Sequence, residues 1–156
     1  MSVEIGKIAP SFNLPCDDGV MIDLSELRGK NVVLYFYPKD DTPGCTIEAQ
    51  DFTANIEKFK KLDTVVLGVS RDSIKSHCKF IDKYNINFNL ISDENGELCS
   101  KYDVLKEKSM FGKKYFGIDR STFIIDKKGN IAQIWRSVKV KNHVEEVLSF
   151  LKQLES

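Results

Sequence analysis

The sequence predicts an α/β fold in which one mixed β-sheet is flanked by helices. Three observations support this class. Apolar strand-length runs alternate with helical periodicity, the run 32–37 contains no polar residue, and the last two strand-like runs are joined by a short polar turn. The chain has 156 residues without a linker or an internal repeat, which suits one domain with a buried core. We therefore expect a single domain over residues 1–156.

The first expected elements are a β-hairpin and a central strand. Residues 12–14 and 21–24 flank the polar turn 15–19, a pattern typical of a hairpin. Because this turn is polar, we expect its Cys16 to be exposed and assign it no function. Residues 32–37, VVLYFY, are apolar throughout, so both faces of this strand should be buried in the middle of the sheet.

Helices and strands alternate through the rest of the chain. Residues 45–61 show apolar side chains at three- and four-residue steps, which predicts a helix with one buried face. The next expected elements are a strand over 64–70, a helix from 72 or 73 to 84, a strand over 89–92 and a short helix with Cys99 in the core. An ordered loop over 104–117, strands over 121–126 and 131–138, and a helix from about 142 are expected to follow.

A polar turn, residues 38–44, separates the central strand from Cys45, the first residue of the expected helix. Open α/β sheets bind ligands at the carboxyl ends of their strands. Unpaired backbone N–H groups and the helix dipole favour an anion at the start of a helix. For a cysteine at this position the anion is its own thiolate, so Cys45 is the candidate reactive residue.

Composition and charge exclude several classes of function. Lys plus Arg and Asp plus Glu both number 23, so net charge gives no reason to expect nucleic acid or an anionic membrane as a partner. No apolar run is long enough to span a bilayer, and the first residues lack a signal sequence, so we expect a cytoplasmic protein. The four cysteines form no C-x-x-C pair and there are two histidines, which argues against a structural metal site.

Pro38, Thr42 and Cys45 form the pattern P-x-x-x-T-x-x-C, which resembles the peroxidatic motif of the peroxiredoxins. The segments YFYPKDDTPGCTIEAQDF and KEKSMFGKKYFGIDRSTFIID are similar to the bacterioferritin-comigratory, or peroxiredoxin Q, branch, and the second segment contains Arg120. The resemblance extends over essentially the whole chain. It implies a thioredoxin fold with an N-terminal hairpin extension, reduction of hydrogen peroxide and organic hydroperoxides, and no metal or prosthetic group.

The resemblance assigns a catalytic role to each of these residues. Cys45 attacks the peroxide as a thiolate, because a thiol is a poor nucleophile, and becomes a sulfenic acid. Arg120 donates to the thiolate and to the peroxide oxygens, and the hydroxyl of Thr42 points into the same pocket. Pro38 has no N–H group and shields the sulfur from water.

The sequence departs from the family pattern at the resolving cysteine. Many members of the branch carry a second cysteine five residues after the first, where this chain has Gln50. Other members place it on the helix after the second strand, and Cys78 lies on that helix, one turn earlier. We therefore predict that Cys78 resolves the sulfenic acid, with a one-cysteine mechanism and an external thiol as the alternative. Either route requires local loosening around Cys45.

Three classes of function remain to be distinguished. The leading hypothesis is a peroxidase that takes electrons from thioredoxin or a similar dithiol protein, acting as a monomer. A peroxide sensor that passes oxidation to a partner would show little steady-state turnover, and a non-catalytic binding module does not explain the four motif residues.

The remaining residues allow two interpretations each. His77 is a packed helix residue or a proton carrier, and Met110, Phe111, Tyr115 and Phe116 line a substrate entrance or an ordinary packed loop.

Overall fold

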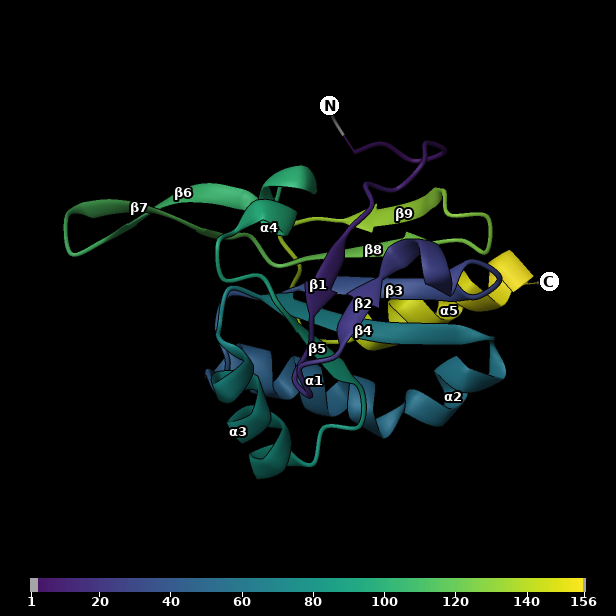
Figure 1. The fold of residues 1–156 in the computed structure, drawn as a ribbon, viewed down its shortest axis with the longest axis horizontal. Coiled ribbons are helices and arrows are strands. Elements are labelled where there is room, and N and C mark those ends of the chain that lie inside the picture. The colour runs from purple at the N-terminus through teal and green to yellow at the C-terminus, as the bar shows by residue number, and fades with distance from the viewer. Residues whose placement is uncertain (1–2, 156) are drawn as a thin grey trace.

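The computed structural model describes residues 3–155 and contains a five-stranded mixed sheet with helices on both faces (Figure 1). The strands stand in the order β5 (Asn89–Ser92), β4 (Thr64–Ser70), β3 (Asn31–Phe36), β8 (Ser121–Ile125) and β9 (Ile131–Trp135). β3 pairs in parallel with β4 and antiparallel with β8. The predicted α/β class and mixed sheet are therefore confirmed.

Every residue of β3 is buried, as the apolar sequence predicts for a central strand. Val33 and Tyr35 point into one hydrophobic cluster, and Val32, Leu34 and Phe36 point into the other. The sheet thus separates two cores, and β3 runs between them.

Helices from four parts of the chain cover the face of the sheet that Val33 and Tyr35 contact. They are α1 (Pro43–Ala54), α2 (Ile56–Lys61), α3 (Ile74–Tyr84) and α5 (His143–Glu155). The other face carries the hairpin β1 (Asn13–Pro15) and β2 (Met21–Asp23), the 3₁₀ helix η1 (Leu24–Leu27) and α4 (Glu97–Lys101). Within residues 3–155, no helix is long and apolar enough to cross a membrane.

The expected helix over 45–61 is two helices, and it begins earlier than predicted. Pro43 is the first residue of α1, a position where proline loses no hydrogen bond. Asn55 interrupts the helix with φ −110° and ψ 8°, and its side-chain amide donates to the carbonyl of Asp51 at 2.8 Å. Cys45 is consequently the third residue of α1 and not the first.

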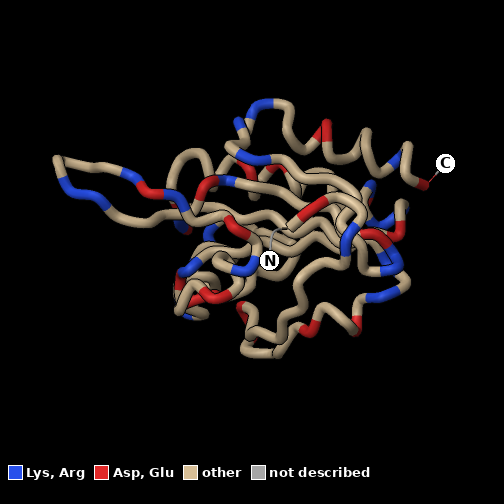
Figure 2. The backbone as a smooth tube through the Cα atoms, turned by 90° about the horizontal axis from the view of Figure 1, so that it is seen from above, with Lys and Arg blue, Asp and Glu red and all other residues tan. Residues whose placement is uncertain are grey.

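The prediction of a loop over 104–117 is wrong, because this segment forms a β-hairpin. Strands β6 (Leu105–Met110) and β7 (Lys113–Ile118) pair antiparallel and project from the body of the molecule (Figures 1 and 2). Phe111 and Gly112 both have positive φ, as a two-residue hairpin turn requires. Most side chains of the hairpin are exposed, so no buried face imposes an alternating pattern on its sequence. Phe111 is 98% exposed, which excludes the packed-loop interpretation for this residue.

The expectation that Cys16 is exposed is also wrong, since its exposed fraction is 2%. Cys16 forms an antiparallel bridge with Ile91, and the Asp17 carboxylate accepts from the backbone N–H of Leu90 at 3.0 Å. Cys16 is buried because the turn docks on the edge strand β5 and satisfies free hydrogen-bonding groups of that strand. The prediction that Cys99 lies in the core is confirmed.

Candidate active site

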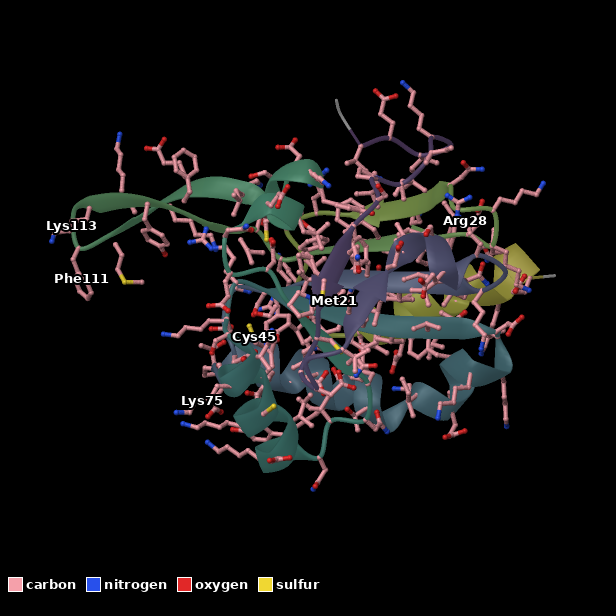
Figure 3. All side chains as sticks on the ribbon, in the orientation of Figure 1. Met21, Arg28, Cys45, Lys75, Phe111 and Lys113 are labelled. Carbon is pink, nitrogen blue, oxygen red and sulfur yellow. The ribbon has the colours of Figure 1, made fainter. Side chains whose placement is uncertain are left out.

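Cys45 lies in the first turn of α1, directly after the loop that follows the carboxyl end of β3. Its exposed fraction is 2%. Figure 3 shows it at the end of the body from which the β6–β7 hairpin projects. No side chain caps the N-terminus of α1, because Thr42 at the N-cap position makes no cap hydrogen bond. The N–H groups of the first turn therefore remain available to a thiolate or its substrate.

The structure brings Arg120 from a distant part of the chain to the sulfur of Cys45. Ser121 pairs with Phe36 where β8 meets the carboxyl end of β3, so the preceding Arg120 stands beside the cysteine turn. Its Nη2 donates to Cys45 Sγ at 3.4 Å. A Cβ on Gly44 would lie 3.1 Å from Nη2, so the absence of a side chain there gives the guanidinium room.

Glu48 is a site residue that the sequence analysis missed. Its Oε1 accepts from Arg120 Nη1 at 2.7 Å, and its side chain is fully buried. Burial raises the pKa of Glu48 to about 7, although Arg120 opposes the shift. Burial also disfavours the charge of Arg120, but Glu48 and Cys45 outweigh it and raise the pKa of the guanidinium. The carboxyl group therefore fixes one arm of the guanidinium while the other faces the sulfur.

The position of Glu48 in the sequence could have identified it as a candidate site residue. The residue follows Cys45 by three positions and precedes Phe52 by four, so it lies on the buried face of α1. A charged residue on such a face needs a partner of opposite charge.

Thr42 and Pro38 lie in the same loop but make no recorded contact with the sulfur. The hydroxyl of Thr42 donates to the carbonyl of Lys39 at 2.9 Å, and so closes its own turn. Pro38 is exposed. Their catalytic roles therefore stay predictions.

The loop before α1 is attached to α3 by hydrogen bonds that the sequence analysis also missed. Ser76 and His77 both contact the Asp40 carboxylate, at 2.7 and 2.8 Å. Lys83 Nζ and the hydroxyl of Tyr84 donate to the Asp41 carboxylate. His77 is a packed helix residue, as one of its two interpretations held, and it is fully buried.

Cys78 lies on the opposite side of α3 from these contacts. Its thiol is exposed and donates to the carbonyl of Asp17 at 2.9 Å. At roughly 100° per residue, Cys78 points about 160° away from the mean direction of the four residues that hold the loop. The sequence analysis expected only local loosening around Cys45. A disulfide between Cys78 and Cys45 would therefore need α3 to rearrange.

The sequence and fold of the chain were compared with those of known proteins. The model of the AhpC/TSA family matches residues 5–134. The chain belongs to this family. Peroxiredoxin Bcp of Bacillus subtilis is 51% identical over 154 residues, covering 99% of this chain and 98% of its own. Peroxiredoxin Bcp of Escherichia coli K12 is 41% identical over 151 residues and covers 97% of each chain.

Solved structures agree with the sequence relatives. The bacterioferritin comigratory protein of Xanthomonas campestris, studied for alkyl peroxide reduction, has a TM-score of 0.92 and 42% identity, covering 98% of this chain and all of its own. A PrxQ mutant of Xylella fastidiosa has a TM-score of 0.94 and 40% identity, covering 100% and 99%. This peroxiredoxin therefore has the thioredoxin fold and catalyses thiol-dependent reduction of peroxides.

Proposed function

We propose that Cys45 is the peroxidatic cysteine and that this enzyme reduces hydrogen peroxide and organic hydroperoxides with electrons from thioredoxin or a similar dithiol protein. The observation that carries the proposal is the 3.4 Å contact between Arg120 Nη2 and Cys45 Sγ at the uncapped start of α1. Both the cation and the free N–H groups favour the thiolate, which is the reactive form.

In the first step the Cys45 thiolate attacks one peroxide oxygen. An S–O bond forms as the O–O bond breaks, and the electron pair leaves on the second oxygen, which takes a proton to give water or an alcohol. Arg120 donates to the oxygens as this negative charge develops. Thr42 orients the peroxide and Pro38 limits the access of water. The product on the enzyme is the Cys45 sulfenic acid, a reversible oxidation state.

In the second step the sulfenic acid condenses with a thiol, forming a disulfide and releasing water. We propose that Cys78 is this thiol, because it is exposed and lies on the helix that contacts the Cys45 loop. Its orientation on the far side of α3 makes unwinding of that helix part of the step. Thiol exchange with the external dithiol then restores both thiols.

We extend the proposal to a monomer in the cytoplasm. All four cysteines are free in the structure, which suits a reducing compartment. Light scattering at assay concentrations tests the monomer, with a dimer mass contradicting it.

Mapping the oxidation products by mass spectrometry tests the chemical steps. The reduced protein is treated with one equivalent of hydrogen peroxide, quenched with a thiol-blocking reagent and digested. We expect a Cys45–Cys78 disulfide in the parent and a sulfenic acid on Cys45 in Cys78→Ser. A parent without an internal disulfide and a Cys78→Ser variant with unchanged thioredoxin-dependent turnover would establish the one-cysteine route instead. Oxidation that spares Cys45 would refute the proposed site.

A further inference from the structure

A buried ion pair connects the Cys45 loop to α3. His77 is fully buried and Asp40 is 7% exposed. His77 Nδ1 lies 2.8 Å from Asp40 Oδ2, and His77 Nε2 lies 3.0 Å from the carbonyl oxygen of Ile91. The imidazole thus bridges the loop, the helix on which it stands, and strand β5.

The two contacts define the charge of the imidazole. A carboxylate and a carbonyl both only accept hydrogen bonds, so each ring nitrogen must carry a proton to satisfy its partner. Only the imidazolium has two N–H groups. A neutral ring would leave one buried acceptor facing a lone pair of the imidazole, which is unfavourable at a fully buried position.

The charged groups around His77 agree with this assignment. Burial alone would lower the pKa of His77, but the hydrogen bond and charge of Asp40, with smaller contributions from Ile91 and Asp72, raise it above the ordinary value. The hydroxyl of Tyr37 also donates to the Asp40 carboxylate. The groups that face His77 therefore come from the end of β3, the Cys45 loop, the loop before α3, and β5.

The position of Asp40 connects this ion pair to the reacting sulfur. Asp40 lies two residues before the N-cap Thr42, and its own backbone N–H donates to Asp72 Oδ2 at 2.8 Å. Both its side chain and its backbone are therefore held by the α3 region. On the helix, His77 immediately precedes Cys78, so the first turns of α3 cannot unwind while the ion pair is intact.

We propose that Asp40 and His77 are positioning residues of the peroxidase reaction: their ion pair holds the Cys45 loop against α3 during peroxide reduction, and it must open before Cys78 reaches Cys45. Neither residue touches the reacting atoms. The proposal rests on the roles proposed above for Cys45 and Cys78.

The sign of the pH dependence follows from the charge. The pKa of His77 is higher in the folded protein than in the opened state, so the stabilisation is fully present at low pH and is lost as pH rises through the folded value. Between the ordinary pKa near 6.5 and the folded value, the opening equilibrium should increase about tenfold per pH unit. Release of α3 is therefore easier in mildly alkaline solution.

Hydrogen exchange measures the opening directly. Backbone amides of residues 39–46 and of the first turns of α3 are followed between pH 6 and 9 in Cys45→Ser, which removes ionisation of that thiol. After correction for the intrinsic exchange rate, we expect their protection to fall with rising pH. The amides of α5 in the same samples are the control, because the pKa of the only other histidine, His143, is lowered by burial to about 4.

Two substitutions at His77 separate charge from packing. His77→Asn retains a neutral donor near the position of Nδ1, whereas His77→Gln places its amide near Nε2 and loses the Asp40 contact. We expect the pH dependence of protection to vanish in both variants, with higher protection in His77→Asn at every pH. A parent without pH dependence, or a dependence that persists in both variants, would overturn the proposal.

A kinetic measurement links the ion pair to the reaction. In the otherwise unmodified enzyme, the rate of disulfide formation after one equivalent of peroxide should rise with pH over the same window, and in His77→Gln the reaction should be faster and depend less on pH. A Cys45 that peroxide does not oxidise would refute the proposed function, and the exchange experiment would still decide the ion pair. If hydrogen exchange behaves as expected but the rate of disulfide formation is unchanged, the ion pair has no role in the resolution of the sulfenic acid.

Discussion

Cys45 and Cys99 occupy the same position in two different helices. Cys45 is the third residue of α1, and Cys99 is the third residue of α4. Both are free and both are buried, with exposed fractions of 2% and 0%. Proximity to a helix N-terminus and burial therefore cannot explain why one is a catalytic candidate and the other a core residue.

The two helix starts differ in what binds their N–H groups. The Asp93 carboxylate accepts from two N–H groups in the first turn of α4, with its Oδ1 on Leu98 N at 3.0 Å and its Oδ2 on Cys99 N at 2.8 Å. Burial and the Asp93 carboxylate both raise the pKa of the Cys99 thiol. At α1 no side chain takes the N–H groups, and the nearest charge is the cation of Arg120. The first-turn N–H groups of α4 are therefore occupied by a carboxylate, whereas those of α1 make no side-chain hydrogen bond.

The largest effect on activity is expected when each of the two thiols is removed in turn. Cys45→Ser should lower thioredoxin-dependent peroxidase activity by on the order of 10⁴-fold or more, because serine is a poor nucleophile at neutral pH. Cys99→Ser, the matched control, should retain activity. Steady-state peroxide consumption and circular dichroism of both variants provide the measurement. An active Cys45→Ser enzyme would show that the sulfur of Cys45 is not the one attacked.

Removing the cation should make the Cys45 environment more like that of Cys99. Arg120→Met should slow the oxidation of Cys45 by about 10²- to 10³-fold, since a charge and directed donors are lost together. Arg120→Lys should recover part of the rate, because lysine keeps the charge without the planar guanidinium. Stopped-flow oxidation of the parent and both variants by hydrogen peroxide measures this rate. Unchanged values in Arg120→Met would remove this residue from the mechanism.

Glu48 is the buried carboxyl group near Cys45, and its ionisation should change the free energy of unfolding. Burial raises its pKa in the folded protein from the ordinary 4.5 to about 7, so the unfolded state ionises first and folding becomes less favourable as pH rises over that range. The loss should be on the order of 3 kcal/mol between pH 4.5 and 7. It is measured as the difference between parent and Glu48→Gln in urea unfolding at each pH. A constant difference would contradict the raised pKa.

The smallest test places a carboxylate at the start of α1, where α4 has that of Asp93. Thr42→Asp introduces a carboxylate at the N-cap of α1, which should stabilise the helix but compete with the Cys45 thiolate for the same N–H groups. Thr42→Asn is the matched neutral control, since it caps equally well and also lacks the threonine hydroxyl. We expect oxidation to be slower in the Asp variant than in the Asn variant by roughly fivefold, corresponding to about 1 kcal/mol. Equal rates would indicate that the helix start contributes little to activation.

Sequence reasoning could propose a reactive centre because its signals are local. Cys45 stands out by its position between an apolar strand and a helical pattern, and the family motif added Arg120 and Thr42. The strands of the main sheet were predicted because their burial imposes a pattern on the sequence. The fold class, the hairpin at the N-terminus and the core position of Cys99 were obtained for the same reason.

The features that were missed depend on contacts between distant residues. Asp40 and His77 lie 37 positions apart, and nothing in the sequence indicates that they form an ion pair. Cys16 looks exposed within its polar turn until the turn docks on β5. The orientation of Cys78 follows from which side of α3 the Cys45 loop contacts, a fact of tertiary structure alone.

The interruption at Asn55 limits how far structural opening can spread. Because φ and ψ leave the helical region there, α1 and α2 are separate hydrogen-bonded units, and fraying that starts at Cys45 has a natural end point twelve residues after Pro43. α2 keeps Phe59 in the core while α1 opens. We therefore expect α1 to open as a cooperative unit smaller than the domain, so that exposing the oxidised sulfur costs only a fraction of the free energy of global unfolding.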